Sequence, residues 1–248
     1  MKQLQDLFKK HKAIVFFDTE TTGLDATRCQ VIELAALKVV PGADGTPVEA
    51  SRLDLFIKLP EGEKLPDKIV ELTGITDEML EADGVTEKEA AEAFFEMCFS
   101  ETTNIVLSAH NIQFDLLFIR EMMKRSLGVD IFRSCRTGGF DSLDTLTVYK
   151  DRRAYPHRLA NAIEAYHLED KVQNSHRAID DVLALYEVCK AMDQERPDLE
   201  NYLKLFGYNP KYGVSGEELP GIRYMPQRFH NFMTSPEMTL PALAGILN

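Results

Sequence analysis

The stretch that decides the fold is IVFFDTETTGL, residues 14–24. Its first four residues are apolar and β-branched or aromatic, and a turn signal at Gly23 closes the run, which predicts a strand buried on both faces. Two acids, Asp18 and Glu20, follow this run with one threonine between them. Alternate side chains of a strand share a face, with Cα atoms about 6.6 Å apart, so both carboxylates can converge on one point. Because desolvated negative charges repel one another, the pattern predicts a divalent metal ion between them.

Outward from this strand, the sequence predicts three strands in succession and then strands that alternate with helices. Further strands are expected over residues 29–40, 49–59 and 104–110, and helices over 3–10, 65–76, 86–99, 111–126, 144–152, 158–168 and 175–192. A Thr-x-x-Glu start, Thr86 to Glu89, is expected for the helix over 86–99, and Asn111 is the expected cap of the helix over 111–126. This order indicates an α/β domain with a mixed sheet.

Composition limits the class of protein. The chain has 248 residues, of which 44% are hydrophobic and 27% charged, as in ordinary globular proteins. It contains no apolar run of about 18 residues, so no signal peptide or spanning helix is expected. Its four cysteines are scattered and form no C-x-x-C pair, which argues against a zinc site and predicts a cytoplasmic protein with free thiols.

The net charge of −12 argues against a protein that coats nucleic-acid backbones, because that mode of binding needs many contacts from basic side chains to phosphates. The charge is nevertheless uneven. Residues 120–158 hold nine bases and five acids, a net charge of +4. This segment forms either a local basic patch or ordinary solvated helix faces, and the sequence leaves both alternatives open.

A third acid lies on the apolar side of the helix expected over 111–126. Asp115 shares a stripe with Phe118, Ile119 and Met122, at spacings of three, four and seven residues. The structural alternative is an acid that caps the helix or stabilises its dipole. That alternative suits an exposed acid better than one on an inward face.

Two adjacent acids begin the last predicted helix of the domain. Helical periodicity places Asp181 inward, on a stripe with Ala178 and Leu185, and Asp180 toward solvent. His176 precedes Asp181 by five positions, where the alternative is a surface or capping histidine. None of these signals decides the function alone, but four acids and one histidine at strand ends and inward helix faces form an ordered set.

Five motifs of residues 13–190 resemble the DEDDh, or DnaQ-like, 3′-5′ exonucleases, which include polymerase proofreading subunits such as that of DNA polymerase III. The motifs are FDTETTGL (17–24), LTGIT (72–76), AHNIQFD (109–115), DTL (144–146) and HRAIDD (176–181). The resemblance implies a ribonuclease-H-like fold, with a mixed five-stranded sheet flanked by helices. It also divides the chain into an exonuclease domain over residues 1–192 and an extension over 193–248 of unknown role.

By this resemblance, Asp18, Glu20 and Asp181 would hold one Mg²⁺ or Mn²⁺ ion, and Asp18 with Asp115 would hold a second. Oxygen ligands suit these ions. His176 would accept a proton from the water that attacks the terminal phosphodiester. The expected reaction is the hydrolysis of a single-stranded nucleic acid from its 3′ end to 5′-mononucleotides. DNA is the favoured substrate.

The resemblance also implies contacts to the last nucleotides. They would come from the Thr21 backbone and from His110, Asn111 and Phe114, with Phe114 stacked on or wedged between bases. The alternative for Phe114 is a place in the core.

The substrate and partner stay open at this stage. An oligoribonuclease or RNA-trimming enzyme has the same chemistry, and a proofreading subunit would bind a DNA polymerase. The segment QLQDLF, residues 3–8, faintly resembles peptides that bind a sliding clamp, although its spacing is off by one residue. The alternative is a helix that packs on the core. Within the extension, an amphipathic helix is expected over 199–206, carried by Leu199, Tyr202, Leu203 and Phe206.

Overall fold

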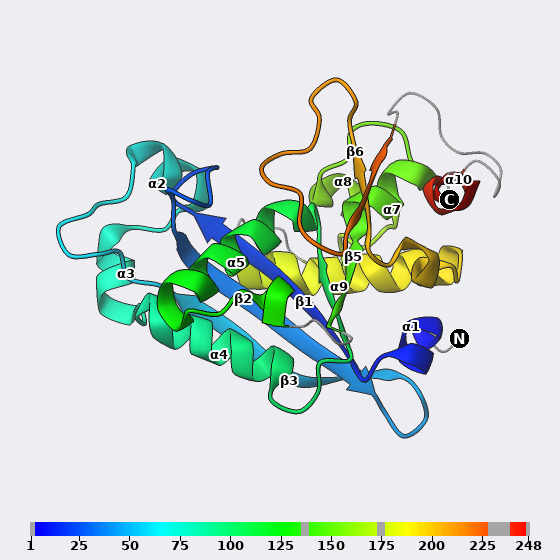
Figure 1. The fold of residues 1–248 in the computed structure, drawn as a ribbon, viewed down its shortest axis with the longest axis horizontal. Coiled ribbons are helices and arrows are strands. Elements are labelled where there is room, and N and C mark those ends of the chain that lie inside the picture. The colour runs from blue at the N-terminus through cyan, green and yellow to red at the C-terminus, as the bar shows by residue number, and fades with distance from the viewer. Residues whose placement is uncertain (1–2, 135–138, 173–176, 228–238, 247–248) are drawn as a thin grey trace.

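The structure is a computed structural model that describes residues 3–134, 139–172, 177–227 and 239–246. Its centre is a five-stranded sheet in the order β3-β2-β1-β4-β5 (Figure 1). The strands are β1 (Ala13–Thr21), β2 (Val31–Pro41), β3 (Pro47–Phe56), β4 (Ile105–Ala109) and β5 (Asp141–Asp144). The pairs β1–β2 and β2–β3 are antiparallel, whereas β1–β4 and β4–β5 are parallel. The predicted α/β class with a mixed five-stranded sheet is therefore confirmed.

Helices cover both faces of this sheet. They are α1 (Gln5–Lys10), α2 (Asp67–Thr73), α3 (Asp77–Asp83), α4 (Glu87–Phe99), α5 (Ile112–Leu127), α6 (Ile131–Ser134), α7 (Thr145–Arg152), α8 (Leu159–Ala165) and α9 (Ala178–Glu195). Helices α4 and α5 pack on one face, and α9 crosses the other (Figure 1). The candidate site lies at the carboxyl ends of the parallel strands, between the helices of the two faces.

Strand β1 is buried on both faces, as its apolar run predicts. Ile14 and Phe16 pack in the core beneath α9, whereas Val15 and Phe17 pack against α4 and α5. The strand continues beyond this run to Thr21, so its two acids lie within the strand rather than after it. By the alternation of side chains, both acids extend the face of Phe16, toward α9.

Two helices begin at the predicted cap residues, but only one of them is capped by its own side chain. A capping box of Thr86 and Glu89 begins α4, as predicted. Asn111 does occupy the cap position of α5, with φ 79°, but its side chain makes no capping hydrogen bond. Instead, Asp144 Oδ1 accepts hydrogen bonds from the backbone N–H groups of Asn111 (2.9 Å) and Ile112 (3.1 Å). A neighbouring strand supplies the cap, and local sequence cannot show this.

The C-terminal extension, residues 193–248, packs against the domain. Its described elements are the last turn of α9, a 3-10 helix η1 (Leu199–Tyr202), strands β6 (Leu205–Tyr208) and β7 (Arg223–Pro226), and α10 (Leu240–Ile246). The prediction of an amphipathic helix over 199–206 is wrong. Lys204 adopts a left-handed conformation, φ 56°, and its N–H bonds to Ser142 of β5, which ends the helical turn and leads Phe206 into β6.

Most of the described bases in the segment over residues 120–158 form ion pairs within the chain, which the sequence does not predict. Arg120 is buried between Asp130 and Glu217, and the Arg152 side chain is fully buried against Glu195 and Asp198. Four further bases of the segment are also ion-paired, namely Lys124, Arg125, Arg133 and Arg153.

The segment QLQDLF belongs to the core rather than to a free peptide. Leu4 and Leu7 are fully buried, and Phe8 packs against the same core. Asp193 in the last turn of α9 also accepts a hydrogen bond from the Leu4 N–H. These apolar side chains are therefore not available to a sliding clamp. None of the described helices is both long and apolar enough to cross a membrane.

Candidate active site

The carboxyl ends of β1, β4 and β5 lie side by side at one edge of the sheet, because these strands are parallel neighbours. Asp18 and Glu20 lie near the end of β1. Two residues separate the end of β4 from the start of α5, and α9 crosses the sheet against β1 and β2. Crevices at the carboxyl ends of parallel strands are common ligand sites in α/β proteins.

Asp115 reaches this edge from the first turn of α5. It is only 3% exposed, and its Oδ1 accepts hydrogen bonds from the N–H (3.1 Å) and the hydroxyl (2.8 Å) of Thr19. Thr19 lies between the two acids of β1. Its two hydrogen bonds therefore hold Asp115 beside the strand that carries Asp18.

Asp181 lies in the first turn of α9 and is half-buried. Its charge helps to raise the pKa values of both Asp18 and Glu20, which places its carboxylate beside theirs. This agrees with the inward face predicted for Asp181. Asp180, which is predicted to face solvent, is also half-buried.

Asp18, Glu20, Asp115 and Asp181, hereafter the acid cluster, are electrostatically strained. Burial, followed by the charges of Asp115, Asp181 and Glu20, raises the pKa of Asp18 well above its ordinary value. Burial and neighbouring carboxylates raise the pKa of Glu20 to about 7. Burial also raises the pKa of Asp115 to about 7, although the hydrogen bonds from Thr19 oppose this shift. The charges of Asp115 and Asp181 act on both Asp18 and Glu20, so the four carboxylates lie close enough to share a counter-charge.

Glu33 is a further acid beside the acid cluster that the sequence analysis missed. It lies on β2 directly opposite Glu20, and its side chain is completely buried. Its carboxylate accepts hydrogen bonds from Arg177 Nε (2.8 Å) and from the N–H of Ala178 (3.1 Å), the first residue of α9. Glu33 thus caps the helix that carries Asp181. The signal was an acid in the apolar run VIELAAL, residues 31–37, where burial demands a partner.

The donor set of the acid cluster fits a hard divalent cation. All its ligand atoms are carboxylate oxygens, which Mg²⁺ and Mn²⁺ prefer, and a cation would relieve the mutual repulsion. Among the residues that the structure describes, however, no three His, Cys, Asp or Glu side chains are arranged as a finished metal group.

The residues expected to contact the substrate are spread over two sides of this edge. His110 and Asn111 line one cleft, whereas Phe114 lines a separate pocket with Leu24 and Leu117. Phe114 is half-buried and also stacks at 4.8 Å on Phe118, so it belongs in part to the core.

The side chains of two further residues expected at the substrate, His110 and Thr21, already make hydrogen bonds within the protein, although the contact expected from Thr21 is that of its backbone. His110 Nδ1 lies 3.0 Å from the Thr145 hydroxyl, and His110 Nε2 lies 2.9 Å from the His157 carbonyl. The Thr21 hydroxyl donates to the Gly23 carbonyl. These bonds fix both side chains in place. His176, the expected base, lies outside the described residues.

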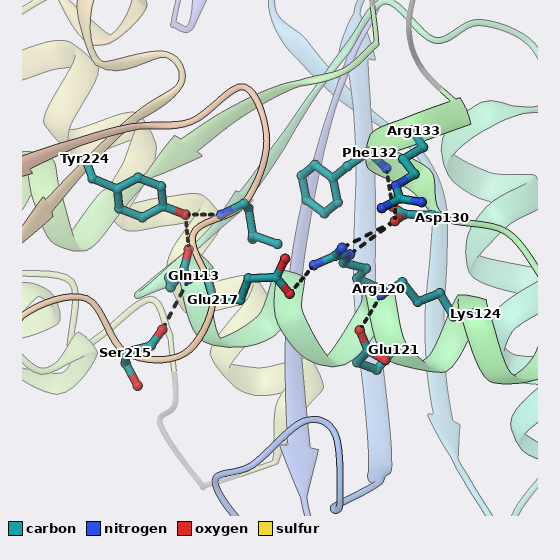
Figure 2. A network of polar contacts seen from close by, with 11 residues as sticks. Gln113, Arg120, Glu121, Lys124, Asp130, Phe132, Arg133, Ser215, Glu217 and Tyr224 are labelled. Atoms are coloured by element: carbon teal, nitrogen blue, oxygen red, sulfur yellow. Dashed lines mark hydrogen bonds and ion pairs between the residues drawn. The ribbon is translucent and has the colours of Figure 1, made fainter.

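The extension also contacts the helix of the site. Gln113, two residues before Asp115, donates from Nε2 to the carbonyls of Ser215 (3.2 Å) and Glu217 (2.8 Å), and it accepts from the Tyr224 hydroxyl (2.6 Å) (Figure 2). Arg120, two turns further along α5, binds the Glu217 carboxylate at 2.9 Å. The connection between β6 and β7 is thereby attached to α5.

This fold, with an acid cluster at the carboxyl edge of a mixed sheet, defines the class of ribonuclease-H-like nucleases. The family described as Exonuclease, of the RNase T type, matches residues 15–189. The chain therefore belongs to this exonuclease family, whose members are hydrolases, and the resemblance to the DnaQ-like 3′-5′ exonucleases is confirmed.

Curated relatives include DNA polymerase III of the PolC type. The chain is 32% identical to that of Clostridium perfringens over 178 residues, which cover 71% of this chain and 11% of the relative. It is 35% identical to that of Halalkalibacterium halodurans over 176 residues, or 68% and 10% of the two chains. The chain thus spans about a tenth of the length of the curated relatives it matches.

Similar solved structures include bacterial Exonuclease I. That of Methylocaldum szegediense superposes with a TM-score of 0.65 at 21% identity, and covers 77% of this chain and 42% of its own. Escherichia coli Exonuclease I in complex with a dA16 oligonucleotide has a TM-score of 0.64 at 18% identity, with the same coverage of both chains. A zinc-bound form of the E. coli enzyme with single-stranded DNA is also similar, with a TM-score of 0.63. At these identities the likeness establishes the fold.

Proposed function

We propose that this chain is a metal-dependent 3′-5′ exonuclease that removes 5′-mononucleotides from the 3′ end of single-stranded DNA. The observation that carries this proposal is the acid cluster itself, which gathers four carboxylates at the carboxyl edge of the sheet, where burial and neighbouring charges raise the pKa values of Asp18 and Glu20. Stability alone does not favour four such carboxylates, because buried like charges repel. A polyanionic substrate would be repelled as well unless cations entered the site with it.

Within the acid cluster, Asp18, Glu20 and Asp181 would hold one Mg²⁺ or Mn²⁺ ion, and Asp18 with Asp115 a second. When bound, the ions supply charge neutralisation and Lewis-acid chemistry at the scissile phosphate. Thr19 keeps Asp115 in position through its two hydrogen bonds. Glu33 keeps the start of α9, and hence Asp181, in position.

His176 is the proposed general base, because it precedes Asp181 by five positions in the sequence and histidine is a common general base near neutral pH. It would accept a proton from the attacking water. His110, Asn111, Phe114 and the Thr21 backbone are the proposed contacts to the terminal nucleotides. The domain boundary at residue 192 also remains a proposal.

DNA is proposed over RNA because the curated relatives are DNA polymerases and several of the similar structures contain single-stranded DNA. The same relatives make a DNA polymerase the proposed partner. The cytoplasm is the proposed compartment.

The test is hydrolysis of matched substrates by the purified chain. Single-stranded DNA, single-stranded RNA, a duplex with a mismatched 3′ end and a dinucleotide are each incubated with Mg²⁺, with Mn²⁺ and with excess chelator. We expect stepwise shortening of single-stranded DNA from its 3′ end, with 5′-mononucleotides as products and no reaction in chelator. Faster cleavage of RNA or dinucleotides would instead favour an RNA-trimming enzyme or an oligoribonuclease. Cleavage of a closed circular strand, or cleavage in chelator, would contradict the proposal.

A further inference from the structure

A cleft of about 850 Å³ opens at the start of α5, the helix that carries Asp115. Its walls come from three segments that are far apart in the sequence. These are the start of α5, helix α7 with the connection from α7 to α8, and the connection from β6 to β7 in the extension. The lining residues are His110, Asn111, Leu146, Lys150, Tyr155, Pro156, His157, Arg158, Asn209, Lys211 and Tyr212. We call it the tyrosine cleft.

The strand that leads into the tyrosine cleft is the neighbour of the strand that carries two members of the acid cluster. His110 directly follows β4, which is the parallel neighbour of the strand that carries Asp18. Neighbouring strands are about 4.8 Å apart. A strand of nucleic acid with its 3′ end at the acid cluster therefore needs only a few nucleotides to reach the cleft.

The charge of the tyrosine cleft is opposite to that of the whole chain. Three of its lining residues are basic, namely Lys150, Arg158 and Lys211, and none of the described lining residues is acidic. Arg158 and Lys211 are exposed. The chain as a whole has 40 acids against 28 bases. A basic cleft in an acidic protein fits a polyanion.

Two aromatic side chains stand exposed in the same cleft. Tyr155 is 77% exposed and Tyr212 is 75% exposed, and no other aromatic residue is among the large exposed hydrophobic residues that the structure describes. Tyr155 comes from the connection between α7 and α8, and Tyr212 from the connection between β6 and β7. Base-stacking platforms combine this pair of features, exposed aromatic rings with neighbouring cations.

We propose that the tyrosine cleft binds the single-stranded DNA upstream of the nucleotide being cleaved. Tyr155 and Tyr212 stack on bases, while Arg158 and Lys211 contact phosphates. The extension thereby supplies one wall of a substrate site that residues 1–192 do not complete. This inference rests on the proposed function, since it assumes that DNA is the substrate of the acid cluster.

The test measures binding of a fluorescent twelve-nucleotide DNA strand by anisotropy in excess chelator, so that hydrolysis does not contribute. Replacing Tyr155 or Tyr212 by leucine should weaken binding about ten-fold each, whereas Y155F and Y212F keep the ring and should bind like the unmodified chain. The variant K211Q should lower the slope of log affinity against log salt by about 0.7. The matched control is K12Q, which removes an exposed lysine just before β1, at the opposite edge of the sheet.

Cleavage provides a second measurement with Mg²⁺ present. For Y155L and Y212L, the ratio of kcat/KM for the twelve-nucleotide strand to that for a dinucleotide should fall about ten-fold, because a dinucleotide is too short to fill the cleft. Unchanged binding and an unchanged ratio, in a chain that still degrades DNA, would overturn the cleft while the proposed function stands. A chain that neither binds nor degrades DNA would overturn both. If Y155L and Y212L weakened the binding or cleavage of an RNA strand but not of DNA, the assignment to DNA would be overturned.

Discussion

Asp18 is the most crowded carboxylate of the acid cluster. Burial raises its pKa first, and the charges of Asp115, Asp181 and Glu20 add to the shift. Without a bound cation, this arrangement destabilises the folded state whenever the carboxylates are ionised. The same repulsion is what makes the site attractive to a divalent ion, so stability and function are opposed at this one side chain.

Replacing Asp18 by asparagine should therefore stabilise the metal-free chain. At pH 8 and in chelator, we expect D18N to raise the free energy of unfolding by about 1 kcal/mol, because it removes a buried charge from a repelling group. The same substitution should abolish any stabilisation by added Mn²⁺. Urea titrations with and without Mn²⁺ measure both effects. A destabilised D18N in chelator would show that the carboxylates do not repel one another in the folded chain.

The adjacent acids of α9 provide a matched pair of substitutions. D181N removes a member of the acid cluster and should lower single-turnover hydrolysis of single-stranded DNA at least about a hundred-fold, because electrostatic stabilisation at metal sites amounts to several kcal/mol. D180N alters a neighbouring carboxylate outside the cluster and should stay within about two-fold of the unmodified chain. Equal losses in the two variants would mean that the face assignment of α9 is wrong.

At the level of single elements, the start of α9 depends on Glu33 from β2. Its completely buried carboxylate faces Arg177, whose side chain is 35% exposed, and also accepts from the N–H of Ala178. Removing one partner of such a pair leaves a buried charge with too few hydrogen bonds. The capping bond alone is a weaker interaction.

We expect R177Q to destabilise the chain by about 2 to 3 kcal/mol, because it leaves the Glu33 carboxylate buried without its cation. The double variant E33Q/R177Q should recover part of this loss, because it removes the uncompensated charge and keeps an acceptor for Ala178. Urea unfolding of the two single variants and the double variant gives the coupling energy between the residues. A coupling energy near zero would mean that the ion pair does not hold α9.

The elements that the sequence predicts well are those whose signal is local. The apolar run of β1 and the capping box of Thr86 are complete within a few residues, and the structure has both. The fifth strand and the cap that Asp144 provides to α5 depend on residues more than 30 positions away, which periodicity cannot show. In the extension, apolar spacing over 199–206 suggests a helix, but pairing with β7 and a contact to β5 make the second half of it a strand.

The same distinction applies to the acid cluster. Its four acids could be identified because each ends a strand run or occupies an inward helical position. Glu33 could not be assigned a role, since its partners Arg177 and Ala178 are about 145 positions away and meet it only in the folded chain. The tyrosine cleft was equally out of reach. Its tyrosines belong to two loops, and loops have no period from which a direction could be predicted.

In the molecule as a whole, Asp141 of β5 connects the segment after α1 with the C-terminal extension. Asp141 binds Nε2 of His11, just after α1, at 3.0 Å, and it binds the ammonium of Lys204, just before β6, at 2.6 Å. Burial alone would raise the pKa of Asp141, but these two hydrogen bonds outweigh it and hold the pKa below its ordinary value. A lowered folded-state pKa means that Asp141 contributes stability above its unfolded pKa of about 3.9 and loses that contribution as the pH falls through the folded value.

The variant D141N should therefore be less stable than the unmodified chain by about 1 kcal/mol between pH 5 and pH 7. The difference should shrink below about pH 4 and vanish once Asp141 is protonated in both states. Urea titrations at a series of pH values test this. A difference that is constant down to pH 3 would assign the effect of D141N to packing rather than to charge.

The extension also controls the wall of the tyrosine cleft that contains Lys211 and Tyr212. The Tyr224 hydroxyl accepts from the N–H of Leu219 (2.7 Å) and donates to Gln113 on α5, and so it holds the connection between β6 and β7 against the helix of the acid cluster (Figure 2). Y224F removes both bonds and keeps the ring, which packs on Phe206.

We expect Y224F to speed amide hydrogen exchange in residues 209–222, because hydrogen bonds of this kind each contribute about 1 kcal/mol to local stability. Preference for the twelve-nucleotide strand over the dinucleotide should fall with it, since a loosened loop presents Tyr212 less often in its stacking position. The matched control is Y166F, which removes a hydroxyl bond to Glu195 of 2.8 Å at the far end of α8. If Y224F loosens the loop but the preference for long strands is unchanged, the loop is an anchor for the extension and not a wall of the substrate site.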